Sequence, residues 1–181
     1  MSTTFLMRDI YMLFDSLYPT QYYESSYVID YEKLYDLGYR GIIYDLDNTL
    51  VPHGAPADER ALKLMDRLKN IGYKIFFLSN NRKERVEMFN EKIGALYLCK
   101  ASKPNKGGYL KAAEMMGLDP SQVLVVGDQI FTDIWGANMA GMRSCLVMPI
   151  DKSTDEIQIV LKRMLENVVL KPYLKKHEII S

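Results

Sequence analysis

The sequence has few cysteines, no long apolar run and no excess charge of one sign. Its two cysteines, Cys99 and Cys145, lie far apart in apolar runs, which excludes a disulfide framework and is typical of reduced thiols in a cytosolic protein. No apolar run approaches the ~18 residues of a membrane span, and Arg8 and Asp9 precede any signal-peptide core. Lys plus Arg and Asp plus Glu both number 23, so no global field attracts nucleic acid. We expect a cytoplasmic protein that does not bind nucleic acid.

Aromatic residues, by contrast, are concentrated near the N-terminus. Ten of the twenty lie within the first forty positions, and eight of those ten are tyrosines. A short amphipathic helix before Pro19 is predicted by apolar residues at spacings of three and four, namely Phe5, Leu6, Ile10, Phe14 and Leu17. We predict that residues 1–38 form an aromatic-rich helical segment packed on a core of residues 39–181. Contact with lipid at the inner face of the membrane is the alternative role for this segment.

Short apolar runs alternate with longer helical patterns beyond Tyr39. Gly72, Gly94 and Gly117 follow three of these patterns, at the position where helices commonly end. A last helix is predicted over about residues 154–169, ending before Pro172 and covering the sheet. Its apolar stripe consists of Ile157, Val160, Leu161, Met164, Leu165 and Val168. The alternation predicts an α/β fold, a three-layer sandwich around a central, mostly parallel five-stranded sheet. The predicted strands are residues 41–45, 73–79, 95–99, 122–128 and 143–148.

Polar residues stand where the apolar runs end. The carboxyl ends of parallel strands share one edge of a sheet, so these side chains are expected in one crevice. Clustered carboxylates favour Mg²⁺, while a hydroxyl and a lysine suit the oxygens of a phosphate. The set predicts phosphoryl transfer, in which one aspartate attacks phosphorus and another protonates the leaving oxygen. The residues concerned are Asp45, Asp47, Thr49, Ser79, Asn80, Lys103, Asp128 and Asp133.

The same residues resemble the four motifs of the haloacid dehalogenase (HAD) superfamily phosphatases. The resemblance covers about residues 39–150 and has the motifs in the right order. The spellings Ser79-Asn80-Asn81 and Gly127-Asp128-Gln129-Ile130-Phe131-Thr132-Asp133 resemble the YqeG-like branch of the capless subfamily IIIA. The four matching stretches are Asp45-Leu46-Asp47-Asn48-Thr49-Leu50, Ser79, Lys103, and Gly127-Asp128 through Asp133.

The resemblance implies a role for each matching residue. Asp45 would be the nucleophile, Asp47 the general acid and base, and Lys103 the cation that neutralises the phosphoryl oxygens. Lys106 is the competing choice for this lysine, with solvation of a helix start as its other role. The implied substrate-binding residues are Thr49, Ser79 and Asn80. The implied Mg²⁺ ligands are Asp45, Asp47 through its backbone carbonyl, Asp128, and Asp133 directly or through water.

The spacing of the motifs leaves no room for a cap domain. Only 33 residues separate Asp45 from Ser79, and 23 separate Ser79 from Lys103, which is barely enough for the crossover helices. A capless site is open. Superfamily members of this kind often act on macromolecular or membrane-bound phosphates, or borrow a neighbouring subunit as a lid, so a homo-oligomer is one expectation.

Three hypotheses about function follow. The favoured one is a Mg²⁺-dependent phosphomonoesterase that acts through an aspartyl-phosphate on Asp45. Because YqeG-like proteins resemble organellar enzymes that convert phosphatidylglycerophosphate to phosphatidylglycerol, the favoured substrate carries a phospholipid headgroup. The alternatives are a phosphatase of a soluble sugar phosphate or nucleotide, and a non-catalytic Mg²⁺-binding regulatory scaffold.

Overall fold

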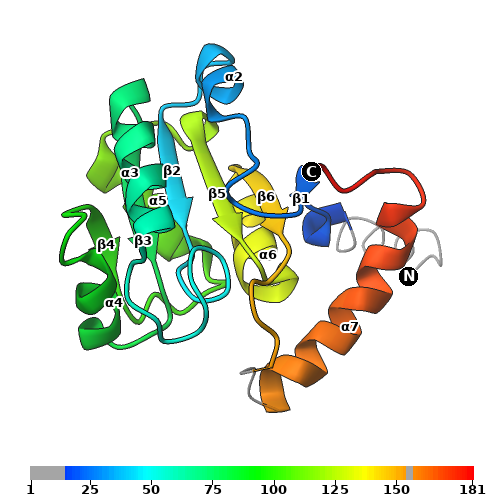
Figure 1. Ribbon diagram of the computed structural model, residues 1–181. Coiled ribbons are helices and arrows are strands. Elements are labelled where there is room, and N and C mark those ends of the chain that lie inside the picture. The colour runs from blue at the N-terminus through cyan, green and yellow to red at the C-terminus, as the bar shows by residue number, and fades with distance from the viewer. Residues whose placement is uncertain (1–14, 154–156) are drawn as a thin grey trace.

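A parallel sheet lies between two layers of helices in the computed structural model, which describes residues 15–153 and 157–181 (Figure 1). Its order is β1-β6-β5-β2-β3-β4, and every neighbouring pair is parallel. The chain winds outward in one direction from β2 and in the other from β5, so the winding reverses between these two strands. The strands are β1 (Gln21–Tyr23), β2 (Gly41–Tyr44), β3 (Lys74–Leu78), β4 (Leu96–Leu98), β5 (Val123–Gly127) and β6 (Arg143–Val147).

The prediction of five strands was wrong by one. The extra strand, β1, lies in the segment predicted to be helical and pairs with β6, with Gln21 opposite Cys145. Three residues are too few to give a strand pattern, so this strand depends on its partner at the sheet edge. The predicted helix that includes Phe5 and Phe14 lies largely outside the described residues, and the division at residue 38 stays a prediction.

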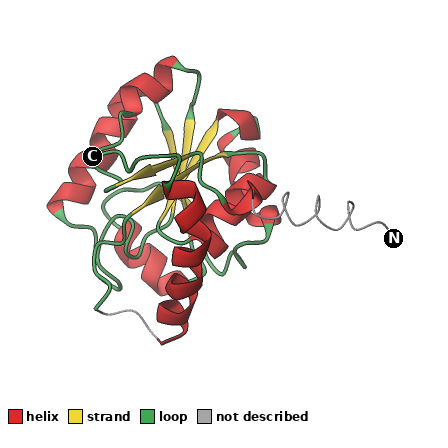
Figure 2. Ribbon diagram, turned by 90° about the vertical axis from the view of Figure 1, so that its right-hand side faces the viewer, coloured by secondary structure: helices red, strands yellow, loops and turns green. Residues whose placement is uncertain are grey.

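Helices cover both faces of the sheet because each central strand is apolar on both sides (Figure 2). On β2, Ile42 and Tyr44 pack into one cluster with α3 and α4, whereas Ile43 packs into another with α5 and α6. The helices of the described residues are α2 (Tyr31–Asp36), α3 (Glu59–Ile71), α4 (Lys83–Asn90), α5 (Lys106–Met116), α6 (Trp135–Met139) and α7 (Ile157–Leu174), with a 3₁₀ turn, η1 (Pro120–Gln122), and a π-helical turn, η2 (Ile130–Ile134).

The tyrosines that follow β1 belong to the core. Tyr31 and Tyr44 are both fully buried, and Tyr44 donates a 2.5 Å hydrogen bond to the Tyr31 hydroxyl. Tyr31 in turn donates to the Ser26 carbonyl at 2.7 Å. Because each buried hydroxyl has a partner, these polar atoms can be buried without an unpaired-donor penalty. Within the described residues, the aromatic segment therefore serves packing.

The last helix, α7, differs from its prediction in length and orientation. It continues through Pro172 to Leu174, although a proline removes one backbone hydrogen bond and crowds the carbonyl four residues before it. Its buried face carries Glu166, Val169, Leu170 and Tyr173. The stripe predicted to cover the sheet is instead exposed at Val160, Leu161, Met164, Leu165 and Val168.

Two further expectations can be compared with the described residues. Gly72 and Gly117 end α3 and α5 with positive φ, as predicted, whereas Gly94 lies in the turn after α4. Cys99 and Cys145 are free thiols, which confirms that no disulfide links them. No described helix is both long and apolar enough to span a bilayer.

Candidate active site

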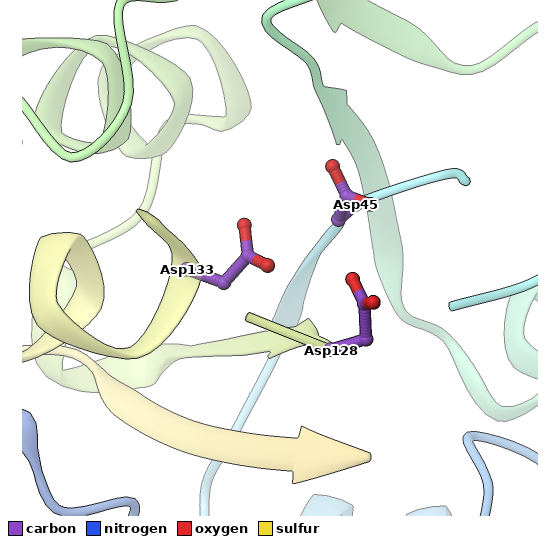
Figure 3. A group of neighbouring side chains, drawn as sticks. All are labelled: Asp45, Asp128 and Asp133. Atoms are coloured by element: carbon purple, nitrogen blue, oxygen red, sulfur yellow. The ribbon is translucent and has the colours of Figure 1, made fainter. Parts of the chain in front are cut away.

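Three aspartates meet at the sheet edge where the winding reverses. Asp45 follows β2, Asp128 follows β5, and Asp133 lies in the π-helical turn η2 (Figure 3). One carboxylate oxygen from each lies within 4.8 Å of the others. Crevices at such reversals are where open α/β sheets bind ligands. Three of the polar residues expected in one crevice, Asp45, Asp128 and Asp133, are therefore brought together there.

Lys103 lies between two of these carboxylates. Its Nζ donates to Asp45 Oδ1 at 2.5 Å and to Asp133 Oδ1 at 2.7 Å, and its side chain is only 4% exposed. Lys106, the competing lysine, is exposed at the first turn of α5. Burial by itself lowers the pKa of Lys103, but the charges of Asp133 and Asp45 raise it well above its usual value. Lys103 is therefore a fixed cation beside Asp45.

The three clustered carboxylates of Asp45, Asp128 and Asp133 are paired with only two cations, Lys103 and Arg163, in the part of the chain that the structure describes. Burial is the main cause that raises the pKa of Asp45 well above its usual value. Burial, together with the neighbouring charge of Asp133, raises the pKa of Asp128 to about 7. Two buried carboxylates, Asp128 and Asp133, and the partly buried Asp45 offer hard oxygen ligands that fit Mg²⁺, since a divalent cation removes their mutual repulsion.

Asp47 lies apart from this cluster and is held by α4 and two loops. Arg85 donates to Asp47 Oδ1 from Nη2 at 2.6 Å and from Nε at 3.1 Å. Asn81 Nδ2 donates to Oδ2 at 2.6 Å, and the Gly54 N–H donates to Oδ1 at 2.9 Å. Although burial opposes ionisation, the hydrogen bonds from Arg85 and the Gly54 N–H and the charge of Arg85 hold the pKa of Asp47 below its usual value. His53 Nδ1 lies 3.8 Å from Asp47 Oδ2.

The general-acid role that the family resemblance implies for Asp47 predicts that replacing Arg85 with Leu changes the pH dependence of phosphate release. Arg85 lowers the pKa of Asp47, so its loss raises that pKa, and the basic limb of the rate profile moves to higher pH. The rate at the optimum falls by about tenfold because Asp47 Oδ1 loses both hydrogen bonds from Arg85. Initial rates from pH 5 to 9 measure both effects. An unchanged profile would show that Asp47 does not titrate in the reaction.

The three predicted substrate-binding residues occupy different positions. Ser79 is 1% exposed, and its Oγ accepts from the Asn81 N–H at 3.1 Å. Asn80 Oδ1 accepts from the Lys103 N–H at 2.7 Å and its Nδ2 donates to the Lys103 carbonyl at 3.3 Å. Asn80 thus positions the loop that carries Lys103. Thr49 Oγ1 lies 3.5 Å from Asp128 Oδ1, which is at the limit of a hydrogen bond.

Arg163 of α7, like Arg85 of α4, contacts the site and could not be identified from the sequence. Its Nη2 donates to Asp128 Oδ2 at 2.6 Å, and its side chain is 13% exposed. The contact joins residues 35 apart in the chain, and no local pattern pairs them. Arg163 therefore fastens the last helix directly to one of the three clustered aspartates.

Gly127 allows Asp133 to approach the end of β5. A Cβ at position 127 would lie 2.4 Å from Asp133 Cγ, closer than packed atoms tolerate. The π-helical turn η2 brings Asp133 to this place, and such turns are frequent at functional sites. The spacing of five residues between Asp128 and Asp133 predicted their meeting, but not the extra backbone turn that achieves it.

Replacing Gly127 with Ala is expected to displace Asp133 and weaken the whole site. The added methyl group forces a shift whose cost is about 1–3 kcal/mol of unfolding free energy. The rate of phosphate release should fall by more than the loss of folded protein explains, since Asp133 also accepts a hydrogen bond from Lys103. Urea unfolding and initial rates test this, with Gly107→Ala as a control in the first turn of α5, where the nearest neighbour is the Asn105 side chain. Wild-type behaviour of Gly127→Ala would contradict the close approach.

Comparisons with known proteins agree with this fold and site. Residues 100–158 match the HAD-hydrolase-like family model. The chain is 34% identical over 162 residues to the probable phosphatase YqeG of Bacillus subtilis (strain 168), covering 89% of this chain and 94% of that protein. It is 27% identical over 158 residues to phosphatidylglycerophosphate phosphatase 1, chloroplastic/mitochondrial, of Arabidopsis thaliana, covering 82% of this chain but only 45% of that protein.

A solved structure shows the same fold at low sequence identity. A haloacid dehalogenase-like family hydrolase from Streptococcus pneumoniae superposes with a TM-score of 0.50 at 13% identity, covering 61% of this chain and 85% of that one. Fold, family match and relatives together define the class, a phosphatase of the HAD superfamily. Within that class, the chain belongs to the YqeG-like family, as its match over nearly the whole length of the Bacillus protein shows. The expected family and enzyme class are confirmed.

Proposed function

We propose that this phosphatase is a Mg²⁺-dependent phosphomonoesterase that acts through an aspartyl-phosphate on Asp45. The observation that supports this most is the position of Asp45, which lies 2.5 Å from the Lys103 cation and beside Asp128 and Asp133. Mg²⁺ would be held by Asp45, Asp128, Asp133 and the Asp47 carbonyl, and would supply positive charge to the phosphoryl oxygens. Lys103 adds a second positive charge at the same place.

The first half of the reaction forms a covalent intermediate. A carboxylate oxygen of Asp45 attacks phosphorus, and the bond between phosphorus and the ester oxygen breaks. Asp47 donates its proton to the departing oxygen, which leaves as an alcohol. For this step the Asp47 carboxyl must turn away from Arg85, Asn81 and Gly54 toward the leaving group, so Arg85 positions Asp47 only between the two proton transfers.

The second half restores Asp45. Asp47, now ionised, accepts a proton from a water molecule that attacks phosphorus. The bond between phosphorus and the Asp45 oxygen breaks, inorganic phosphate leaves, and Asp47 again carries its proton. Arg85 favours the ionised form of Asp47 and therefore helps this half of the cycle more than the first.

The proposed substrate is phosphatidylglycerophosphate, hydrolysed to phosphatidylglycerol at the inner face of the membrane. The Arabidopsis relative bears this activity in its name, and the connections that would carry a cap, residues 45–58 and 79–105, are short and hold no extra domain. An open site accepts a headgroup that projects from a lipid surface. The site also accepts a soluble phosphate ester, which makes such esters the necessary comparison.

The test compares the lipid substrate with soluble esters. Phosphatidylglycerophosphate in mixed micelles and a panel of sugar phosphates and nucleotides are incubated with Mg²⁺ and the full chain, with Asp45→Asn as the blank. The proposal predicts that kcat/KM is higher for the lipid than for every soluble ester. A higher kcat/KM for a soluble ester would identify that ester, and not the lipid, as the preferred substrate. Phosphate release without Mg²⁺ would contradict the proposed dependence on the metal.

A further inference from the structure

The outward side of α7 carries a continuous apolar stripe. Val160, Leu161, Met164, Leu165 and Val168 are 45%, 57%, 62%, 60% and 62% exposed. Their spacing of three and four residues places them on one side of the helix, opposite the buried face. In Figure 2 the helix faces the viewer, and no described segment lies outside it. A stripe of this size on one helix marks an interaction surface.

The charges along this helix are almost all positive. Lys171 continues the stripe at the same helical spacing, and Lys162 is also exposed on the helix. Exposed Lys175 and Lys176 follow directly after the helix ends. The single acidic residue of α7, Glu166, is 5% exposed and lies on the inward face. An apolar stripe that ends in lysines fits a surface whose apolar layer lies beneath a negatively charged one. The apolar side chains enter the apolar layer, and the lysines extend their charge toward the negative layer.

The stripe lies next to the active site. A pocket of about 290 Å³ between α7 and the sheet is lined by Asp128 on one side and by Val160 and Met164 on the other. Arg163 lines the same pocket and holds Asp128 at 2.6 Å. Whatever covers the stripe is therefore presented to the edge of the catalytic crevice.

We propose that the outward face of α7 is a docking surface for an anionic lipid bilayer. The apolar side chains enter the boundary of the acyl chains, and the lysines contact the headgroup phosphates. The inference rests on the proposed function, because the docking surface would bring a lipid phosphate to Asp45. A second copy of the chain fits less well, since the described part of α7 offers its own lysines no exposed acidic partner.

Vesicle binding by the full chain, measured without substrate, tests the surface. Vesicles of equal parts phosphatidylcholine and phosphatidylglycerol are compared with phosphatidylcholine alone. The double substitution Leu161→Gln and Leu165→Gln makes two of the five stripe residues polar, and neither of the two lines the pocket. Leu37→Gln is the matched control, since Leu37 is 65% exposed at the end of α2. The stripe variant should bind anionic vesicles at least about tenfold more weakly than wild type, and the control should bind as wild type does.

Three results would overturn the docking surface. They are no binding by wild type, equal binding by wild type and the stripe variant, and a wild-type dimer that the stripe variant abolishes while vesicle binding is absent. Hydrolysis of a soluble phosphate ester should be equal in all three proteins, which also shows that each is folded. If vesicle binding follows the prediction but neither phosphatidylglycerophosphate nor any soluble ester is hydrolysed, the docking surface stands and the proposed function fails.

Discussion

Replacing Asp45 with Asn lowers phosphate release by at least about a thousandfold in our account, because an amide oxygen does not form the aspartyl-phosphate. The fold should survive the change. Burial raises the pKa of folded Asp45 above its unfolded value, so the ionised carboxyl costs stability at neutral pH. Asn removes that cost, and Lys103 keeps Asp133 as its partner. Without metal, the variant should therefore melt at the same temperature as wild type or higher.

Initial rates and thermal melting measure the two effects separately. Asp66→Asn, an exposed change on α3, is the matched control and should alter neither quantity. Retained phosphate release by Asp45→Asn would remove Asp45 from the nucleophile's role. A melting temperature far below that of wild type would show that Asp45 stabilises the fold, so that lost activity would say nothing about chemistry.

Mg²⁺ binding is expected to stabilise the protein strongly. At a free concentration 100 times its Kd, a ligand that binds only the folded state adds about 2.7 kcal/mol. For a chain of this size that corresponds to a rise in Tm of roughly 5–11 °C. Asp128→Asn should lose most of the rise, because the three-carboxylate set is broken, whereas Asp66→Asn should keep it. An equal rise in Asp128→Asn would contradict a site at this cluster.

The pH dependence of this stabilisation has a definite sign. The pKa of folded Asp128 is raised to about 7, above its unfolded value, so the folded state binds the extra proton. Metal-free stability should therefore fall as the pH rises from about 4 to 7. Metal binding requires the ionised form, so the gain from Mg²⁺ should grow over the same range. Melting curves at pH 5, 6, 7 and 8, with and without Mg²⁺, test both trends.

The central architecture could be predicted because buried parallel strands are apolar on both faces. The runs ending at Asp45 and Asp128 stand out for that reason, and glycines such as Gly72 mark the ends of helices. The three-residue strand β1 could not be predicted, since its structure depends on pairing with β6. The orientation of α7 was missed because its buried side includes Glu166 and its exposed side is the more apolar.

The site could be predicted where strand ends deliver its residues to one edge. Asp45, Lys103, Asp128 and Asp133 meet as their positions suggested. Arg85 and Arg163 were missed because each reaches the site from a helix, across 38 and 35 positions of the chain. Their effect depends on how α4 and α7 pack, and single-sequence patterns do not contain that packing.

The most direct test of the account is to identify the residue that becomes phosphorylated. The full chain is acid-quenched during turnover of a phosphate ester with Mg²⁺, reduced with borohydride and digested for mass spectrometry. An acyl phosphate is reduced to an alcohol, so our account predicts homoserine at position 45 and nowhere else, and none in Asp45→Asn. Homoserine at another aspartate, or its absence from all of them while phosphate is released, would contradict the aspartyl-phosphate on Asp45.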